Sequence, residues 1–256
     1  MTFKSKCNQF LKNGKNINLK NANFDDSNYV YCNSLNASTN LFLNGVLDSN
    51  IKCVIVGTLT PEAGRNNGYF YSSPKNVTMK ILDNYFKPNS CKFADFAQKL
   101  NNNKKDKNII DAIKDELTQN KIAFLDVVKD AIASKKSASD KKIKEFNLDI
   151  TSFAKIDDDM SFICNSRNSE YALLIILQTL IKSQNIKINN INEFEQWKNY
   201  FDSKQNVEQK YPVSINLKNN HGKSYKYTIY YAPQYNYRLT SYKRQSMWNT
   251  VFEDIF

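Results

Sequence analysis

A short apolar run that ends in glycine constrains the fold of this chain more than any other feature. The run Ile51–Gly57, IKCVIVG, is rich in β-branched residues and is typical of a strand buried in a parallel sheet. The stretch Ile51–Leu82 that contains it has three of the six glycines and two of the five prolines of the chain, together with a Tyr-Phe-Tyr cluster. An ordinary connection does not need such aromatic residues, so the loop after this strand is a candidate binding site.

Three further strands are predicted along the chain, and helical patterns separate them. They are Lys121–Val128, Asp159–Asn165 and the second arm of a hairpin around Asn220-His221-Gly222. Apolar residues at helical spacing predict helices at 76–86, 91–100, 109–117, 169–182, 191–201 and 241–256. This alternation predicts a three-layer α/β/α sandwich whose central, mainly parallel sheet has about four strands.

The residues before this pattern have a different character. Residues 1–48 are polar and rich in Asn, and we expect them to form an N-terminal extension packed on the α/β domain of residues 49–256. The longest apolar run, Tyr171–Ile181, is shorter than the roughly 20 residues that cross a bilayer, and the N-terminus lacks the apolar region of a signal peptide. We therefore expect a cytoplasmic protein with no membrane partner, and a monomer.

The pattern of cysteines, the single histidine and the net charge limit the kinds of site and partner that this protein can have. The five cysteines are scattered and form no C-x-x-C pair, which argues against a disulfide framework, a structural zinc site and an iron–sulfur cluster. The only histidine, His221, is interpreted as a turn residue at the hairpin tip. We therefore expect no metal and no cofactor. With 36 basic and 25 acidic residues the formal net charge is +11, which favours polyanionic partners.

Ligands of open parallel sheets bind beyond the carboxyl ends of the strands. Four segments occupy these positions in the predicted sheet: Gly57–Asn76, Asp126–Asp130, Asn165–Arg167 and Ala232–Arg244. The first of them contains neither a G-x-G-x-x-G pattern nor a P-loop lysine, which argues against a nucleotide-binding protein of those types.

In this order, the four segments resemble motifs of the uracil-DNA glycosylase superfamily, nearest to the branch of hypoxanthine (deoxyinosine) and uracil DNA glycosylases. Gly57-Thr58 and Pro61 resemble its G-[ST]-F-P motif, and GYFYSSPKN resembles its G-F-Y-Y-x-H-P-x-N segment. FLDVV and SASDKKI are similar to W-D-V and G-S-L-D-x-x-I, and ICNSRNSEYA to F-N-G-x-x-A. YAPQYN resembles the late L-P-S-T-S-P loop, so the resemblance runs from about residue 50 to the C-terminus.

The sequence also departs from this pattern. Thr58-Leu59-Thr60-Pro61 is one residue longer than the usual motif, so no Asp or Asn falls where several relatives have a water-activating side chain. Ser73 replaces the histidine before the proline, and the late loop lacks its serines.

The resemblance implies a base that is flipped out of the nucleic acid into a pocket. It implies that Tyr71 lies against the flipped base, although Tyr69, Phe70 and Tyr71 are also suited to the core beneath the loop. Asp126 falls where relatives place the side chain that faces the base edge, and a carboxylate there would accept hydrogen bonds from N–H groups. Asn76 would orient water or contact the base. The alternative for Asp126 and for Asn76 is helix capping.

The remaining site residues are expected in the same loops. Glu62 is the one carboxylate of the first loop and a candidate general base, and Thr60 is a candidate to hold the water. The resemblance implies that Gly57, Thr58, Pro61 and Asn165 contact the substrate.

The segment YAPQYNYRLTSYKRQSMW interleaves aromatic and basic residues, which is typical of a nucleic-acid contact. Its candidate DNA-binding residues are Gln234 and Tyr235 as wedges, with Arg238, Lys243 and Arg244 as phosphate contacts.

Three functions are compatible with these observations. The first is a metal-free, monofunctional DNA glycosylase that removes uracil, hypoxanthine or a modified pyrimidine and leaves an abasic site. The second is a defence glycosylase that acts on a hypermodified base of phage DNA, for which the small Ser72-Ser73 pair would leave space. The third is a catalytically inactive relative that binds nucleic acid or protein.

Overall fold

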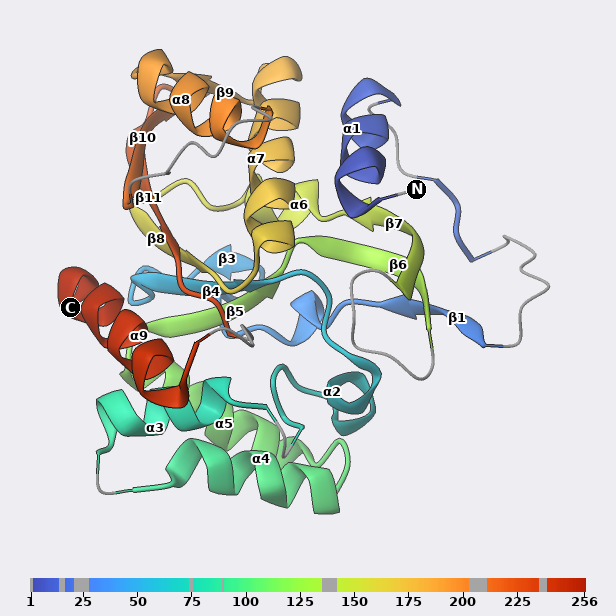
Figure 1. The fold of residues 1–256 in the computed structure, drawn as a ribbon, viewed down its shortest axis with the longest axis vertical. Coiled ribbons are helices and arrows are strands. Elements are labelled where there is room, and N and C mark those ends of the chain that lie inside the picture. Colours follow the sequence, from blue (N-terminus) through green and yellow to red (C-terminus); the bar gives the residue numbers. More distant parts are fainter. Residues whose placement is uncertain are drawn as a thin grey trace.

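The computed structural model describes residues 2–13, 17–20, 28–73, 76–88, 90–134, 142–202, 211–234 and 239–256. Its centre is a six-stranded sheet in the order β5-β4-β8-β11-β10-β9. Strands β5, β4, β8 and β11 are parallel neighbours, and β10 and β9 extend the sheet in antiparallel pairing. Helices cover both faces of this sheet (Figure 1). The predicted three-layer α/β/α fold is confirmed, with the four expected parallel strands as its core.

The elements have the following bounds. The strands are β1 Tyr29–Asn33, β2 Phe42–Leu43, β3 Val46–Leu47, β4 Cys53–Gly57, β5 Ile122–Asp126, β6 Val128–Ser134, β7 Ile143–Leu148, β8 Met160–Cys164, β9 Ile186–Ile188, β10 Val213–Asn219 and β11 Ser224–Tyr231. The helices are α1 Phe3–Asn13, the 3₁₀ helix η1 Asn36–Ser38, α2 Glu62–Asn67, α3 Thr78–Phe86, α4 Lys92–Asn102, α5 Lys107–Gln119, α6 Ile150–Phe153, α7 Arg167–Lys182, α8 Ile191–Asp202 and α9 Ser241–Ile255.

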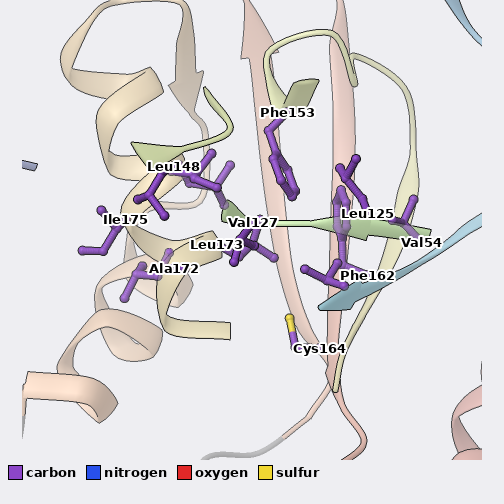
Figure 2. Packing of buried hydrophobic residues seen from close by; sticks show 14 of the residues in the cluster. Val54, Leu125, Val127, Leu148, Phe153, Phe162, Cys164, Ala172, Leu173 and Ile175 are labelled. Atoms are coloured by element: carbon purple, nitrogen blue, oxygen red, sulfur yellow. The ribbon is translucent and has the colours of Figure 1, made fainter. Parts of the chain in front are cut away.

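The two faces of the central sheet contact different sets of helices. Along β4, Val54 and Val56 pack into the core that contains α1, α6, α7 and α8, a part of which Figure 2 shows. Cys53 and Ile55 point to the opposite core, beneath α3, α4, α5 and α9. All four side chains are completely buried. Because neighbouring residues of a strand point to opposite faces, a run without polar residues fits only a strand covered on both sides.

A second sheet of three antiparallel strands, in the order β1-β6-β7, lies beside the first and was not predicted. Its middle strand, β6, begins two residues after β5 ends. The sequence Ile122–Ser134 therefore contains two strands of different sheets with only Val127 between them. Hydrophobic periodicity does not mark the point at which a chain leaves one sheet and enters another. Strand β1 and helix α1 attach the N-terminal residues to this sheet.

Side chains of residues 36–40 cover the free edge of β5. Asn36 pairs with both backbone groups of Asp126, since its Oδ1 accepts from the Asp126 N–H (2.8 Å) and its Nδ2 donates to the Asp126 carbonyl (2.8 Å). Thr39 donates to the carbonyl of Phe124 (2.6 Å), and Asn40 donates to that of Ile122 (2.8 Å). An uncovered edge strand exposes such groups to pairing with other chains. These bonds also fix the end of β5, where Asp126 lies.

The helices that follow β8 and β11 in the chain, α7 and α9, are capped by side chains. Ser166 accepts from the N–H of Ser169 at the start of α7, with a reciprocal bond that completes a capping box. Thr240 accepts from the N–H of Lys243 at the start of α9 (3.2 Å).

Among the described residues, no helix has the length and apolar character that crossing a membrane requires.

Candidate active site at the carboxyl ends of the parallel strands

Six residues from all four predicted segments meet at the carboxyl edge of the sheet. We call them the strand-end cluster: Gly57, Thr60, Tyr71, Asp126, Asn165 and Gln234. In the sheet, β4 lies between β5 and β8. The chain continues from β4 to β5 on one side, and from β8 towards β11 on the other side, so the two connections run in opposite directions. A crevice at this type of switch point is the usual ligand site of open α/β sheets.

Gly57 brings the cluster together because it has no side chain. A Cβ atom at this position would lie 2.6 Å from Asp126 Oδ1 and 2.9 Å from the hydroxyl oxygen of Tyr71. It would lie 3.8 Å from Asn165 Nδ2. Polar atoms of three different segments therefore occupy the space above one glycine, which explains why this strand ends in glycine.

Asp126 is only 2 % exposed, and the loop after β4 fixes its carboxylate. The backbone N–H of Thr60 donates to Asp126 Oδ2 at 2.6 Å, and the Thr60 hydroxyl donates to the same oxygen at 2.7 Å. Hydrogen bonds to a carboxylate are stronger than those between neutral groups. Thr60, predicted to hold a water, thus binds Asp126 directly. The other oxygen of this carboxylate, Oδ1, lies above Gly57, on the same side as the hydroxyl group of Tyr71.

Tyr71 adopts an unusual backbone conformation within the cluster. Its φ of 51° lies in the left-handed region, which costs an aromatic residue on the order of 1–2 kcal/mol. Its hydroxyl accepts a hydrogen bond from Asn165 Nδ2 at 2.7 Å. Its ring packs against Phe124 with centroids 4.7 Å apart and planes at 65°. Strained residues of this kind concentrate at functional sites. Tyr69 and Phe70 are completely buried in the core beneath the loop.

Asn165 and Gln234 form the opposite side of the cluster. The backbone N–H of Gln234 donates to the Asn165 carbonyl (3.0 Å), and Asn165 Nδ2 donates to Gln234 Oε1 (3.2 Å). Gln234 was expected as a wedge, but it is 6 % exposed and lies inside the cluster. Its Nε2 group is buried and has no hydrogen-bond partner among the described residues. A buried donor without an acceptor costs about 1–3 kcal/mol, so this group is a candidate to donate to a ligand.

The other residues of the first loop lie around the cluster. Thr58 is buried, with its hydroxyl 3.2 Å from that of Ser166. Pro61 precedes α2, and Glu62 lies half-buried in the first turn of that helix. Asn76 precedes α3, where its Oδ1 accepts from the N–H of Thr78 at 2.8 Å. The N-cap residue of α3 is Val77, which has no side-chain cap, so Asn76 binds the first helical N–H from one position before the N-cap.

The predicted DNA-binding residues after Gln234 divide into two groups. Lys243 and Arg244 lie in the first turn of α9, with Lys243 exposed and Arg244 half-buried. Tyr235 and Arg238 lie outside the described residues.

Sequence reasoning missed two contributors near the cluster. Asn36 binds the backbone of Asp126 and also donates to Asp149 Oδ2 (2.6 Å), but one asparagine in an Asn-rich segment gives no signal. Arg167 follows Asn165-Ser166 directly, so its position behind β8 was a usable signal. Its guanidinium lies 3.7 Å from the ring centroid of Tyr231 and binds the fully buried Glu170 (2.7 Å).

Glu170 is the centre of this second arrangement. Its Oε1 accepts from Trp197 Nε1 (2.9 Å) and from the hydroxyl of Tyr211 (2.5 Å). Burial, followed by the Glu170 charge, raises the pKa of Tyr211, so the phenol remains a donor to the carboxylate. The group joins α7, α8 and β11 beside the strand-end cluster, and Ser166 connects the two because it caps α7 and touches Thr58.

Within the described ranges, no three His, Cys, Asp or Glu side chains are grouped closely enough to bind a metal ion. No family model matches the chain, and no curated protein or solved structure is significantly similar to it. These comparisons therefore place the chain in no family.

Proposed function

We propose that the protein is a metal-free, monofunctional DNA glycosylase of the cytoplasm. It hydrolyses the N-glycosidic bond of a flipped-out base and leaves an abasic site. One observation carries the proposal: residues of four separate segments, each expected from the glycosylase motifs, converge over Gly57 at the switch point of the sheet.

The polar atoms of the cluster favour a base in its lactam form. Gln234 Nε2 offers a buried N–H donor, and the carboxylate of Asp126 offers an acceptor. A base edge with a C=O next to an N–H complements this pair, as in the O6/N1–H edge of hypoxanthine or the O4/N3–H edge of uracil. Cytosine and adenine present the opposite order, an amine donor next to an unprotonated ring nitrogen, so they would fit this pair only with the base edge reversed.

Hydrolysis breaks the bond between C1′ and the base nitrogen, and the bonding electrons leave with the base. Water adds to C1′ and gives up one proton, and the departing base takes up one proton, so the products are the neutral free base and an abasic sugar. A carboxylate near C1′ stabilises the positive charge that develops on the sugar, and it can accept the proton of the water. We assign these roles to Asp126, whose carboxylate lies in the cluster, and to Glu62, the one carboxylate of the loop after β4.

The test is a panel of oligonucleotides, single-stranded and duplex, that contain uracil, hypoxanthine, xanthine, hydroxymethylated or glucosylated cytosine. After incubation, alkali cleaves at abasic sites and mass spectrometry identifies the released base. We expect cleavage with uracil or hypoxanthine. Cleavage only with a modified cytosine would instead support the defence glycosylase. If folded protein releases no base from any oligonucleotide, the glycosylase proposal is wrong. The alternative of a catalytically inactive binding protein then remains.

Two variants, each without one carboxylate, test which side chain stabilises the charge on the sugar and which accepts the proton of the water. Asp126→Asn keeps the shape of the side chain but removes its charge, and we expect it to lower the rate of base release by about 100-fold or more. Glu62→Gln is the matched variant at the edge of the site. If only Asp126→Asn is slow, Asp126 both stabilises the sugar and accepts the proton. Unchanged rates in both variants would contradict the carboxylate mechanism.

A further inference from the structure

We propose that the groove between α3 and α9 binds the phosphate backbone of the nucleic-acid strand beside the base pocket, and that Tyr242 stacks on an unpaired base of that strand. The placement beside a base pocket rests on the proposed function. The binding itself does not, because it requires no base removal.

The groove has a volume of about 420 Å³ and lies between the first turns of two helices. Its lining includes Lys80, Ile81 and Asn84 from α3 and Tyr242, Arg244 and Gln245 from α9. Asn84 Nδ2 donates to Gln245 Oε1 (2.9 Å) and joins the two helices. Helix α3 follows the loop that contains Tyr71, and α9 follows the segment that contains Gln234 (Figure 1). The two helices that form the groove are therefore the ones that come next in the sequence after two segments of the strand-end cluster.

The cations at the groove have no carboxylate partner in the described part of the chain. Lys80 and Arg244 line the groove and Lys243 precedes Arg244 on α9, and none of the three takes part in an ion pair of the described residues. No acidic side chain is among the lining residues. The Nε of Arg244 is buried without a hydrogen-bond partner in that part of the chain. By contrast, Lys87 at the other end of α3 lies 3.4 Å from Glu116. A set of unpaired cations on a concave surface complements a phosphodiester backbone.

The helix dipoles add to this argument. Acidic residues are favoured near helix N-termini, yet the first turns of α3 and α9 contain none. They carry Lys80 and Lys243 instead, and the positive end of the helix dipole repels a cation at this position. A bound phosphate would remove the repulsion at both helices simultaneously.

Tyr242 supplies the contact that distinguishes a strand with unpaired bases from duplex DNA. Its side chain is 81 % exposed at the rim of the groove, the highest value among the large hydrophobic residues that the structure describes. Stacking of a base on an aromatic ring stabilises the binding of unpaired strands and tolerates any base. We infer that the groove prefers single-stranded DNA, or the distorted strand next to a flipped base, over regular duplex.

The experiment measures binding of fluorescein-labelled 20-mers of unmodified DNA by anisotropy, as a function of salt. Lys80→Ala and Arg244→Ala should each weaken binding and lower the slope of log K against log salt by about 0.7 for single strands. Tyr242→Ala should weaken single-strand binding by about fivefold or more, with a smaller effect on duplex.

Two controls accompany these variants. Lys187→Ala removes an equally exposed lysine from β9, at the far edge of the sheet, and should bind DNA as the wild type does. Arg244→Lys keeps the charge and should retain the salt slope, which separates a phosphate contact from a loss of folding. Equal losses in Lys187→Ala and Lys80→Ala, wild-type binding by all groove variants, or no DNA binding by the wild type would each overturn the proposal.

The outcome separates this proposal from the enzymatic one. Groove variants that lose binding to unmodified DNA support the groove even if no base is released from any oligonucleotide. Base release by a wild type whose groove variants bind and react normally supports the glycosylase and refutes the groove.

Discussion

At the scale of single residues, Gly57 decides whether the strand-end cluster can form. In Gly57→Ala, the new Cβ would lie within 3 Å of Asp126 Oδ1 and of the Tyr71 hydroxyl oxygen, closer than real Cβ contacts. We expect the carboxylate and the phenol to be displaced, and the rate of base release to fall about tenfold or more, since small misplacements of catalytic groups are costly. The measurement is single-turnover base release with the best substrate of the panel.

The matched control for this change is Gly45→Ala. Gly45 has a φ of 83° in the turn between β2 and β3, and nothing lies within 4 Å of its would-be Cβ. An alanine there should lower the free energy of unfolding by about 1 kcal/mol through backbone strain, with base release unchanged. If Gly57→Ala lost stability but kept full activity, the close packing over Gly57 would have no functional role.

The sequence predicted the residues of the cluster better than their roles. Gly57, Asp126 and Asn165 lie at the ends of the predicted strands, whereas the choice of Tyr71 came from the resemblance of the first loop to the glycosylase motif. Thr60 and Gln234 were expected to contact water and DNA, but their hydrogen bonds join them to Asp126 and Asn165. Which neighbour a polar side chain finds depends on how the loop folds back, and a local pattern does not contain that information.

At the scale of elements, the segment of residues 36–40 acts as a cover for the edge of β5, and Asn36 is its most connected residue. Asn36→Ala would remove two hydrogen bonds to the backbone of Asp126 and one to Asp149. We expect the free energy of unfolding to fall by about 2–3 kcal/mol, because buried polar groups lose their partners. Urea unfolding measures the loss. Asn50→Ala, at an exposed asparagine, is the control and should change stability by about 0.5 kcal/mol or less.

The Glu170 arrangement joins three elements, and its loss should affect all of them. Glu170→Ala would leave Arg167 without its carboxylate and Trp197 without the acceptor of its N–H. We expect a loss of about 3 kcal/mol, the lower end for a broken buried pair because Arg167 is partly exposed. Chemical unfolding followed by tryptophan fluorescence measures it. Glu195→Gln removes an exposed partner of Lys198 and should cost about 0.5 kcal/mol. Equal effects of the two changes would contradict a structural role for Glu170.

The elements themselves were predicted unevenly. The four parallel strands and the helices α3, α4, α5, α7, α8 and α9 agree with the expected ranges, because long periodic segments and buried β-branched runs give strong local signals. The sheet β1-β6-β7 was missed, since β1 pairs with β6 across about 100 residues of sequence. Pairing at that separation depends on burial that only the folded chain provides.

At the scale of the whole molecule, the buried tyrosines make the free energy of unfolding depend on pH in the alkaline range. Burial, followed by the charge of Asp157, raises the pKa of Tyr225 to about 12. Burial also raises the pKa of Tyr171 to about 12 and raises that of Tyr227 well above its ordinary value. In the unfolded chain these phenols titrate near 10. The unfolded state therefore releases protons first, and their stabilising contribution is complete below about pH 10 and is lost as the pH rises towards 12.

We therefore expect the free energy of unfolding to fall steeply between pH 10 and pH 12. Urea unfolding at pH 8, 10 and 11 measures the fall, and absorbance at 295 nm reports whether phenolate appears together with unfolding. Tyr225→Phe removes one of the raised groups, so its stability should decline less steeply than that of the wild type over this interval. A variant curve parallel to the wild-type curve would mean that the Tyr225 phenol ionises alike in both states. Phenolate absorbance that rises fully before unfolding would contradict burial of these side chains as the cause.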